Sequence, residues 1–369
     1  MAKTPDAARS QGLVMRTFAQ TNCPVCGGPG TLLYEGLVDR LFGAPGSWNH
    51  RHCQSMDCAL VWLDPCPLSE DLHLAYIRYF THGGGADAGR SNGGLDRLLR
   101  GLMRIPRSLV RIPVRWLEKA YLRRTYGIGG PGWNGQAGLF SLFPQAKADA
   151  DFRQAYLADS PRAKLMEVGC GDGSLLQRLK DRGFDAEGID IDPGAVAQAR
   201  SKGLKVGLGD LASARILDAS YDFVVASHAI EHVPDPLALL VECNRILKPG
   251  GSAVFITPNI ESFGHRAFKQ NWLHLDPPRH LHLFTVASLR RLGLDAGFAK
   301  VETRTAPRDA RTLFHASREI ASSGTFVWGK PLSALRWVWA SGLLIQEACS
   351  LRRRPNQGEE IILYLVSNS

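Results

Sequence analysis

The chain has 369 residues, of which 44% are hydrophobic and 21% are charged, and its net charge is +9. This composition is typical of a globular protein with a packed core, and it excludes a disordered or fibrous chain. The start of the chain lacks the apolar run of a signal peptide, and the longest strongly apolar stretch, residues 337–345, is far shorter than the roughly 20 residues that cross a bilayer. We therefore expect a cytoplasmic protein with more than one folded part.

The N-terminal region concentrates cysteine. Residues 1–20 are predicted to form a flexible tail, and residues 21–66 contain two cysteine pairs on short turns, formed by Cys23, Cys26, Cys53 and Cys58. A module of this length needs a metal or disulfides to fold, and a reducing compartment favours a metal. Four thiolates suit tetrahedral zinc, so we expect a zinc-ribbon-like module with structural Zn²⁺.

The second pair leaves the ligand set partly open, because four residues separate its cysteines where two are commonest. His52 in place of Cys53 is one alternative, and Cys66 is a spare cysteine nearby. Four thiolate ligands leave no open coordination position, so no catalytic role is predicted for this metal.

Residues 67–160 are predicted to hold a linker and a basic helical insert. Residues 83–94 are rich in glycine and small polar residues, which is typical of a linker. Residues 95–124 then carry nine Lys or Arg and two Asp or Glu, with apolar residues at helical spacing from Leu95 to Met103. Pro106 and Pro113 are expected to divide this amphipathic segment into short helices. Such a local positive patch favours a local anionic partner, such as a membrane surface.

The most informative motif lies between residues 164 and 192. Glycines at 169, 171 and 173 follow a strand-like run ending Glu167-Val168, and Asp190 comes twenty-one positions after Gly169. Glycines permit a tight turn with close approach of a ligand, and an acid after the next strand suits a ribose hydroxyl. Ser174 stands where a dinucleotide fingerprint requires its third glycine. The motif therefore predicts a nucleoside cofactor other than NAD or FAD.

This pattern resembles the class I S-adenosylmethionine (SAM)-dependent methyltransferases, and further segments recur in the order of that family. The resemblance covers residues 161–306 and a final strand in 358–369. It implies an α/β fold: a doubly wound, seven-stranded Rossmann-like sheet whose last strand is antiparallel. The cofactor residues that it implies are Glu167, Gly169, Gly171, Gly173, Asp190, Ile191, Asp210, Leu211, Ser227 and His228.

The acceptor side is predicted to lie after the fourth and fifth strands. His232 forms an acid–His pair with Glu231, similar to one in the ubiquinone-pathway O-methyltransferases, some of which use it with a divalent metal. The matching upstream acid is not evident because His228 stands there, so no catalytic metal is expected. The predicted catalytic residues are His232, His280 and His282, and the predicted substrate-binding residues are His274, Asp276 and Arg279.

Residues 307–357 are predicted to form a helical insert. Trp337 and Trp339 adjoin an apolar run, and three arginines follow at 352–354. This arrangement suits either a lid over the substrate or contact with a membrane interface, and the sequence leaves both readings open.

A Trp…Pro-Arg-His segment like residues 272–280 occurs in methyltransferases associated with bacterial surface-glycan synthesis. The resemblance therefore implies SAM-dependent O-methylation of a sugar or cell-envelope glycan, including a lipid-linked one, by a cytoplasmic or peripheral membrane enzyme. Sugar C-methylation is an alternative, although those enzymes carry a large C-terminal domain that this chain lacks. A nucleic-acid-binding zinc-ribbon protein is the alternative outside the enzymes, but the aromatic platform that binds single strands is missing and no nucleic acid is expected.

Overall fold

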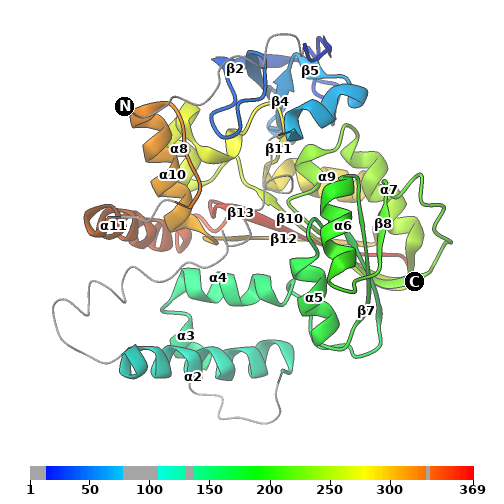
Figure 1. The fold of residues 1–369 in the computed structure, drawn as a ribbon, viewed down its shortest axis with the longest axis vertical. Helices are drawn as coiled ribbons and strands as arrows, with labels where there is room; N and C mark the ends of the chain where they lie inside the picture. Colours follow the sequence, from blue (N-terminus) through cyan, green and yellow to red (C-terminus); the bar gives the residue numbers. More distant parts are fainter. Residues whose placement is uncertain (1–13, 78–106, 129–136, 330–332) are drawn as a thin grey trace.

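The computed structural model describes residues 14–77, 107–128, 137–329 and 333–369, with the side chains of 107–115, 137 and 334 left aside. Its centre is a seven-stranded sheet in the order β12-β13-β10-β9-β6-β7-β8 (Figure 1). The strands are β6 (Lys164–Val168), β7 (Asp185–Asp190), β8 (Val206–Leu208), β9 (Tyr221–Ser227), β10 (Leu247–Pro258), β12 (Lys300–Ala306) and β13 (Glu360–Val366). Neighbouring strands are parallel except at β13, which is antiparallel to both β10 and β12. The predicted fold class is confirmed.

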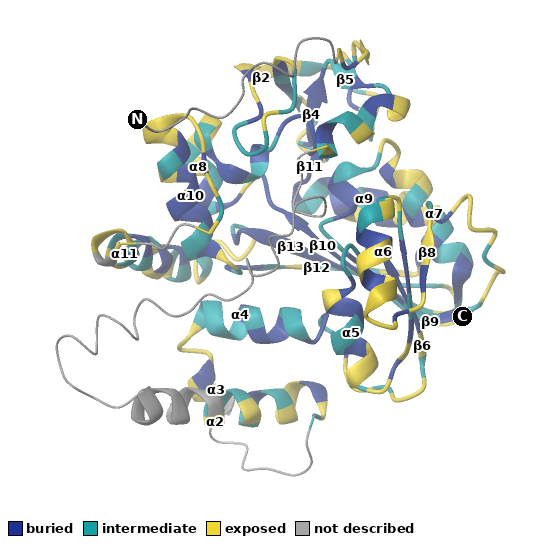
Figure 2. Ribbon diagram, in the orientation of Figure 1, coloured by how far each residue is buried: buried dark blue, intermediate teal, exposed yellow. Residues whose placement is uncertain are grey.

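Helices cover both faces of this sheet because its central strands are apolar on both sides. Val224 packs into one core with helices α7 (Pro236–Ile246) and α9 (Val286–Asp295). Val225, the next residue, packs into the opposite core with α4 (Pro144–Arg153), α5 (Ser174–Asp181) and α6 (Pro193–Ser201). Figure 2 shows the buried sheet between these layers. Such two-sided burial is typical of parallel strands.

Several helices begin where the sequence supplies a side chain that caps them. Asp192 accepts a hydrogen bond from the Gly194 amide at the start of α6, and Asp235 accepts one from Ala238 at the start of α7. Thr285 and Ser288 form a reciprocal capping box at α9. These caps fix the points at which the chain leaves the carboxyl ends of the strands.

A second sheet joins the N-terminal module to the methyltransferase-like part of the chain. It contains β2 (Gly30–Leu37), β3 (Trp48–Cys53), β4 (Val61–Asp64) and β11 (His282–Leu283), in the order β11-β4-β3-β2. The edge strand β11 comes from the loop that follows β10, more than 200 residues downstream of β4. The module is therefore completed by a strand from the second half of the chain.

The module is also longer than the predicted residues 21–66. β1 (Thr17–Phe18), in the predicted tail, pairs with β5 (Cys66–Pro67), and the 3₁₀ segment η1 (Ser69–Tyr76) packs beside them. Arg16 binds Asp71 through two side-chain hydrogen bonds of 2.8 and 2.9 Å. Residues 14–20 are thus part of the module, and the tail prediction was wrong for them because the pairing partners lie beyond residue 65.

The described part of the basic insert forms one long helix where short helices were expected. α2 (Arg107–Tyr126) runs through Pro113, so the predicted break there was wrong. Packing of the second half of α2 offsets the lost hydrogen bond: Tyr121 and Tyr126 donate to Asp151 of α4 at 2.5 and 2.8 Å. α2 also packs against the short helix α3 (Ala137–Phe140). The predicted amphipathic segment 95–106 lies outside the described residues.

The C-terminal insert forms α10 (Ala310–Ser323) and α11 (Ala334–Leu351), which pack against each other. Trp337 stacks under the Arg311 guanidinium at 4.7 Å and Trp339 under that of Arg318 at 4.3 Å, measured to the ring centroids. Both tryptophans are half-buried against α10. Within the described ranges, no helix combines the length and apolar character needed to cross a membrane.

Candidate functional site

The glycine-rich turn after β6 has the backbone that its sequence predicts. Gly169, Gly171 and Gly173 all have positive φ, at 67°, 53° and 76°. A Cβ at Gly169 would lie 2.7 Å from the Cβ of Ala229, and one at Gly173 would lie 2.3 Å from Leu204. A Cβ at Gly171 would meet nothing within 4 Å, so open space lies above this backbone, where a ligand can approach.

Asp190 stands at the end of β7 and holds the turn in place. Its two carboxylate oxygens accept hydrogen bonds from the amides of Gly171 (2.7 Å) and Asp192 (2.8 Å). Each oxygen retains a second lone pair, which is the chemistry that ribose hydroxyls require. The residues present therefore fit the nucleoside end of SAM.

Two other predicted cofactor residues differ sharply in environment. Glu167 is buried, burial raises its pKa to about 8, and its Oε2 has no hydrogen-bond partner among the described residues. Asp210 is exposed, and hydrogen bonds from Ser213 lower its pKa. Glu167 thus offers a neutral carboxyl that can donate, whereas Asp210 offers an ionised acceptor beside the buried Leu211. Ile191, predicted beside them, is exposed, and Ser227 ends β9 half-buried.

Three of the predicted acceptor histidines come together beyond the carboxyl ends of β9 and β10, beside His228. The rings of His228 and His274 stack at 6.0 Å, and those of His274 and His280 stack at 6.1 Å. His280 then meets His232 edge-on, with 4.7 Å between ring centroids. His228 and His232 follow β9, whereas His274 and His280 follow β10, so the two loops converge as the order of parallel strands requires.

The tautomers of two of these histidines follow from their hydrogen bonds. Nδ1 of His232 lies 3.0 Å from the Arg279 carbonyl, and Nδ1 of His280 lies 2.7 Å from the His274 carbonyl. A carbonyl only accepts, so each Nδ1 carries a hydrogen. Burial, followed by the nearby His280, lowers the pKa of His232 to about 4. His232 is therefore neutral at physiological pH, with Nε2 ready to accept a proton.

His228, predicted at the cofactor, has the opposite electrostatics. Its two ring nitrogens lie 3.2 Å from Glu231 and 2.9 Å from Glu360. Burial would lower its pKa, but the hydrogen bonds to these carboxylates outweigh burial and raise it to about 9. Arg308 also binds Glu360, so the group is a compact cluster of alternating charge. A histidine held as a cation in this way is not a base.

Arg279, predicted to grip the substrate, is committed elsewhere. It is fully buried, and its guanidinium binds Asp39 at 2.7 and 2.8 Å and also Asp276. Its side chain therefore joins the N-terminal module to the loop after β10, and Asp276 completes the same ion cluster. Neither side chain is available for a substrate anion in this arrangement, because a buried charge pair is broken only at high cost.

His282, predicted as a third catalytic histidine, lies apart from the other four. It is part of β11, where it pairs with Trp62 of β4, and its Nε2 lies 3.4 Å from the Pro234 carbonyl. Burial lowers its pKa to about 4. Its ring contacts Phe284, with 6.0 Å between the ring centroids.

The N-terminal module supplies residues that the sequence analysis did not find. The Tyr76 hydroxyl lies 3.1 Å from Nδ1 of His232, and the Tyr34 hydroxyl lies 2.9 Å from Nε2 of His265. His50 is fully buried, and neither of its nitrogens has a partner within the described residues. Tyr76 is 156 positions before His232, so no local pattern in the sequence could connect them.

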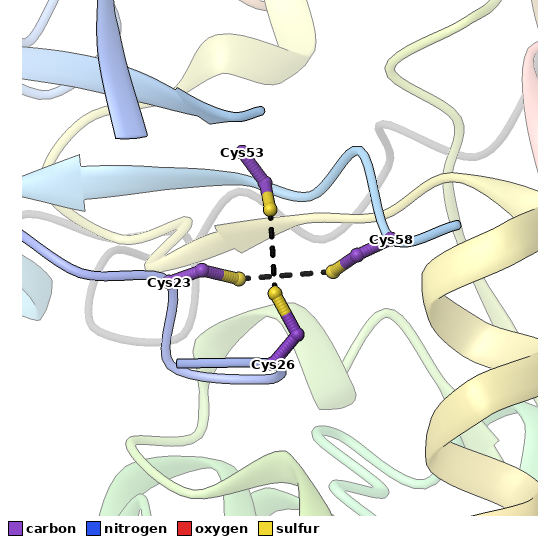
Figure 3. Close-up of side chains that lie close together, drawn as sticks. All are labelled: Cys23, Cys26, Cys53 and Cys58. Carbon is purple, nitrogen blue, oxygen red and sulfur yellow. Dashed lines mark hydrogen bonds between the residues drawn. The ribbon is translucent and has the colours of Figure 1, made fainter. Parts of the chain in front are cut away.

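The four predicted zinc ligands form a compact cluster. Figure 3 shows the Sγ atoms of Cys23, Cys26, Cys53 and Cys58 directed toward a common centre. All four lie within 4.8 Å of one another, with 3.7 Å between Cys23 and Cys58 and 3.4 Å between Cys26 and Cys53. This donor set fits tetrahedral zinc, and the two alternative ligands, His52 and Cys66, lie outside the cluster.

A second group of possible metal ligands lies in the histidine cluster. One ligand atom each from Glu231, His232 and His280 falls within a 4.8 Å span. The carbonyl partners on both Nδ1 atoms orient the rings as second-shell groups do at metal sites. Glu231 also accepts a hydrogen bond from Thr257 at 2.9 Å and is paired with His228, so much of its carboxylate is already used. The geometry thus permits a cation without requiring one.

Comparison with known proteins agrees with this geometry. Residues 144–303 match the family described as a methyltransferase domain. The chain is 33% identical over 134 residues to a ubiquinone biosynthesis O-methyltransferase of Methylococcus capsulatus, a match that covers 34% of this chain and 56% of the relative. It is 36% identical over 110 residues to the protein of the same name from Xanthomonas oryzae, covering 27% of this chain and 45% of the relative. The chain therefore spans about half the length of the curated relatives it matches.

The similar solved structures are more distant in sequence. A phosphoethanolamine N-methyltransferase of Haemonchus contortus is 14% identical, covers 84% of this chain and 64% of its own, and has a TM-score of 0.44. A SAM-dependent methyltransferase from Archaeoglobus fulgidus is 19% identical, covers 73% of this chain and 99% of its own, and has a TM-score of 0.40.

Proposed function

We propose that this chain is a class I SAM-dependent methyltransferase that transfers a methyl group to a hydroxyl group, a proposal supported by the match of residues 144–303 to a methyltransferase domain. The observation that supports an oxygen acceptor is the pair His232 and His280, which contact backbone carbonyls through Nδ1 and whose Nε2 atoms are left unused by the described hydrogen bonds. Transfer to a hydroxyl requires removal of its proton, and a positioned imidazole is suited to accept it.

Two neighbouring groups of residues would carry out this reaction, one at the cofactor and one at the acceptor. SAM, when bound, supplies an electrophilic methyl carbon on a sulfonium. Asp190 orients the ribose through its free lone pairs. The open space beside Gly171 lets the ligand come close to the backbone of the glycine turn. His232 or His280 then accepts the hydroxyl proton as the oxygen attacks, while Tyr76 and the Arg279 carbonyl hold the His232 ring.

For the acceptor we propose a hydroxyl of a sugar or cell-envelope glycan. The support is the sequence segment around Trp272 and His280, together with an N-terminal module that contacts His232 through Tyr76 and contains a cluster of four cysteines. A phenolic hydroxyl is the competing acceptor, since the relatives matched over residues of this domain are named for ubiquinone biosynthesis. Sugar C-methylation is the third possibility, and it would use the same histidines to remove a proton from carbon.

The Cys23, Cys26, Cys53 and Cys58 cluster is proposed to hold structural zinc. The domain layout that we propose places this module at residues 14–77, the helical insert at 107–157, and the cofactor-binding core at 161–306 and 358–369. Binding of nucleic acid by the module is the non-enzyme alternative, and it would appear as salt-dependent association with single or double strands.

The test combines binding and transfer. Calorimetry should show SAM binding that Asp190→Ala weakens about tenfold or more, while Asp185→Ala at the exposed start of the same strand leaves it unchanged. Methyl transfer should then be screened over nucleotide sugars, lipid-linked saccharides and hydroxylated quinones.

On the substrate so found, His232→Ala and His280→Ala should each be compared with His73→Ala, a histidine outside the cluster. At least one of the first two should lower turnover by roughly 10²-fold without weakening SAM binding. Full turnover in both cluster variants would show that the base lies elsewhere. Failure to bind SAM at all would refute the proposed function.

A further inference from the structure

Helix α11 presents a line of apolar side chains to solvent. Leu335, Val338 and Ile345 are 85%, 51% and 64% exposed, and their spacing of three and seven residues places them on one face. The exposed Gly342 and Cys349 continue the same line. These five residues are called the α11 stripe. By contrast, Trp337 and Trp339 point toward α10, where Arg311 and Arg318 cover their rings.

The exposed charges on and after α11 are positive. Arg336 lies beside the α11 stripe near the start of the helix, half-exposed and 3.9 Å from the largely buried Glu319 of α10, and the exposed arginines 352–354 follow the end of the helix. The only acid in α11 is Glu347, which is fully buried. An exposed apolar line bordered by arginines, with no exposed acid on the helix, is the pattern of helices that lie in a membrane interface.

We propose that the α11 stripe docks the protein onto an anionic lipid surface, with the helix lying flat in the interface. From Leu335 to Ile345 the helix rises only about 15 Å, so it matches a surface contact and does not span the membrane. The apolar side chains enter the region below the headgroups, and the four arginines contact lipid phosphates. Figure 1 shows α11 at the left edge of the molecule, below α10.

A second copy of the chain is the competing occupant, and the charges oppose it. Two antiparallel α11 helices would set arginines 352–354 of one chain against Arg336 of the other, with no exposed acid on either helix to compensate. Like charges placed together disfavour such a pair, whereas a lipid surface supplies both the negative charge and the apolar layer. This inference does not rest on the proposed methyl transfer.

The experiment is co-sedimentation of the full chain with vesicles of phosphatidylcholine, with and without phosphatidylglycerol. We expect binding only to the anionic vesicles, and release by salt. The double variant Val338→Asp/Ile345→Asp should bind the anionic vesicles at least about tenfold more weakly than the unchanged protein. The matched control is Leu217→Asp/Leu294→Asp, which changes two leucines that are 79% and 59% exposed elsewhere, and it should bind like the unchanged protein.

Three outcomes would overturn the proposal. One is the absence of binding to anionic vesicles at low salt. Another is equal binding by the stripe variant and the unchanged protein, since the contact would then lie elsewhere. The third is a dimer in sedimentation velocity that the stripe variant alone converts to monomer, which would assign the stripe to a second copy. Circular dichroism and SAM calorimetry on each variant distinguish loss of docking from loss of folding or of the proposed function.

Discussion

At the scale of single residues, the site is defined by which histidines carry charge. Four histidines lie in ring contact, yet two carboxylates hold His228 as a cation while His232 stays neutral. The sequence correctly placed His232 and the segment that follows β10 in one cluster, because both leave the carboxyl ends of neighbouring strands. It could not separate their charges, since those depend on Glu360 and on burial, which have no local signature.

The low pKa of His232 predicts the pH profile of the reaction. Only the neutral ring accepts a proton, so activity is lost as the pH falls through the pKa of the base. With burial lowering that pKa from 6.5 to about 4, kcat/KM should stay nearly constant from pH 8 down to about pH 5. We expect Tyr76→Phe to leave SAM affinity unchanged but to move the acidic limb, because it removes a group from the ring of His232. A limb near pH 6.5 in the unchanged protein would contradict this assignment.

At the scale of elements, predictions succeeded where the pattern was local and failed where packing decided. The seven-stranded sheet was implied by the family resemblance, and the glycine turn was predicted from the spacing of its residues. Pro113 was expected to break a helix, but contacts of Tyr121 and Tyr126 sustain α2 across it. The sequence left open whether the segment with Trp337 and Trp339 forms a lid or contacts a membrane, and arginines of α10 cover both rings in the structure. Contacts between separate elements cannot be predicted from the sequence of either segment alone.

The four-cysteine cluster of the N-terminal module gives a testable prediction. We expect about one zinc per chain by metal analysis, because four thiolates share one centre (Figure 3). Cys26→Ser should lower zinc content and the melting temperature, since metal binding contributes directly to folding. Cys66→Ser, which changes a half-buried cysteine outside the cluster, should keep both the zinc and most of the stability. A metal-free protein of unchanged melting temperature would refute the site.

At the scale of the whole molecule, the module and the cofactor-binding core are one folded unit. β4 pairs with β11, Thr285 donates to the Cys58 carbonyl at 2.8 Å, and Asp39 pairs with Arg279 across 240 positions. The sequence identified both parts but placed a boundary between them, because it contains no signal that marks which loop completes another sheet.

The buried pair of Asp39 and Arg279 tests this unity. Asp39→Ala should destabilise the protein by roughly 3–5 kcal/mol, because it leaves the fully buried Arg279 with one of its two acidic partners. Denaturant unfolding should still show a single transition for both parts of the chain. Asp57→Ala, on the exposed surface of the module, is the matched control and should cost little. Two separate transitions in the unchanged protein would indicate independent domains.

The pairing of β11 with β4 also limits how parts of this fold can be exchanged between proteins. A chimera that swaps the N-terminal module at a sequence boundary would leave β4 without its edge partner, and α9 without the carbonyl that its capping threonine binds. The residues that follow β10 would have to travel with the module, although more than 200 positions separate them. Transplanting acceptor specificity between such proteins therefore requires two discontinuous segments, exchanged together.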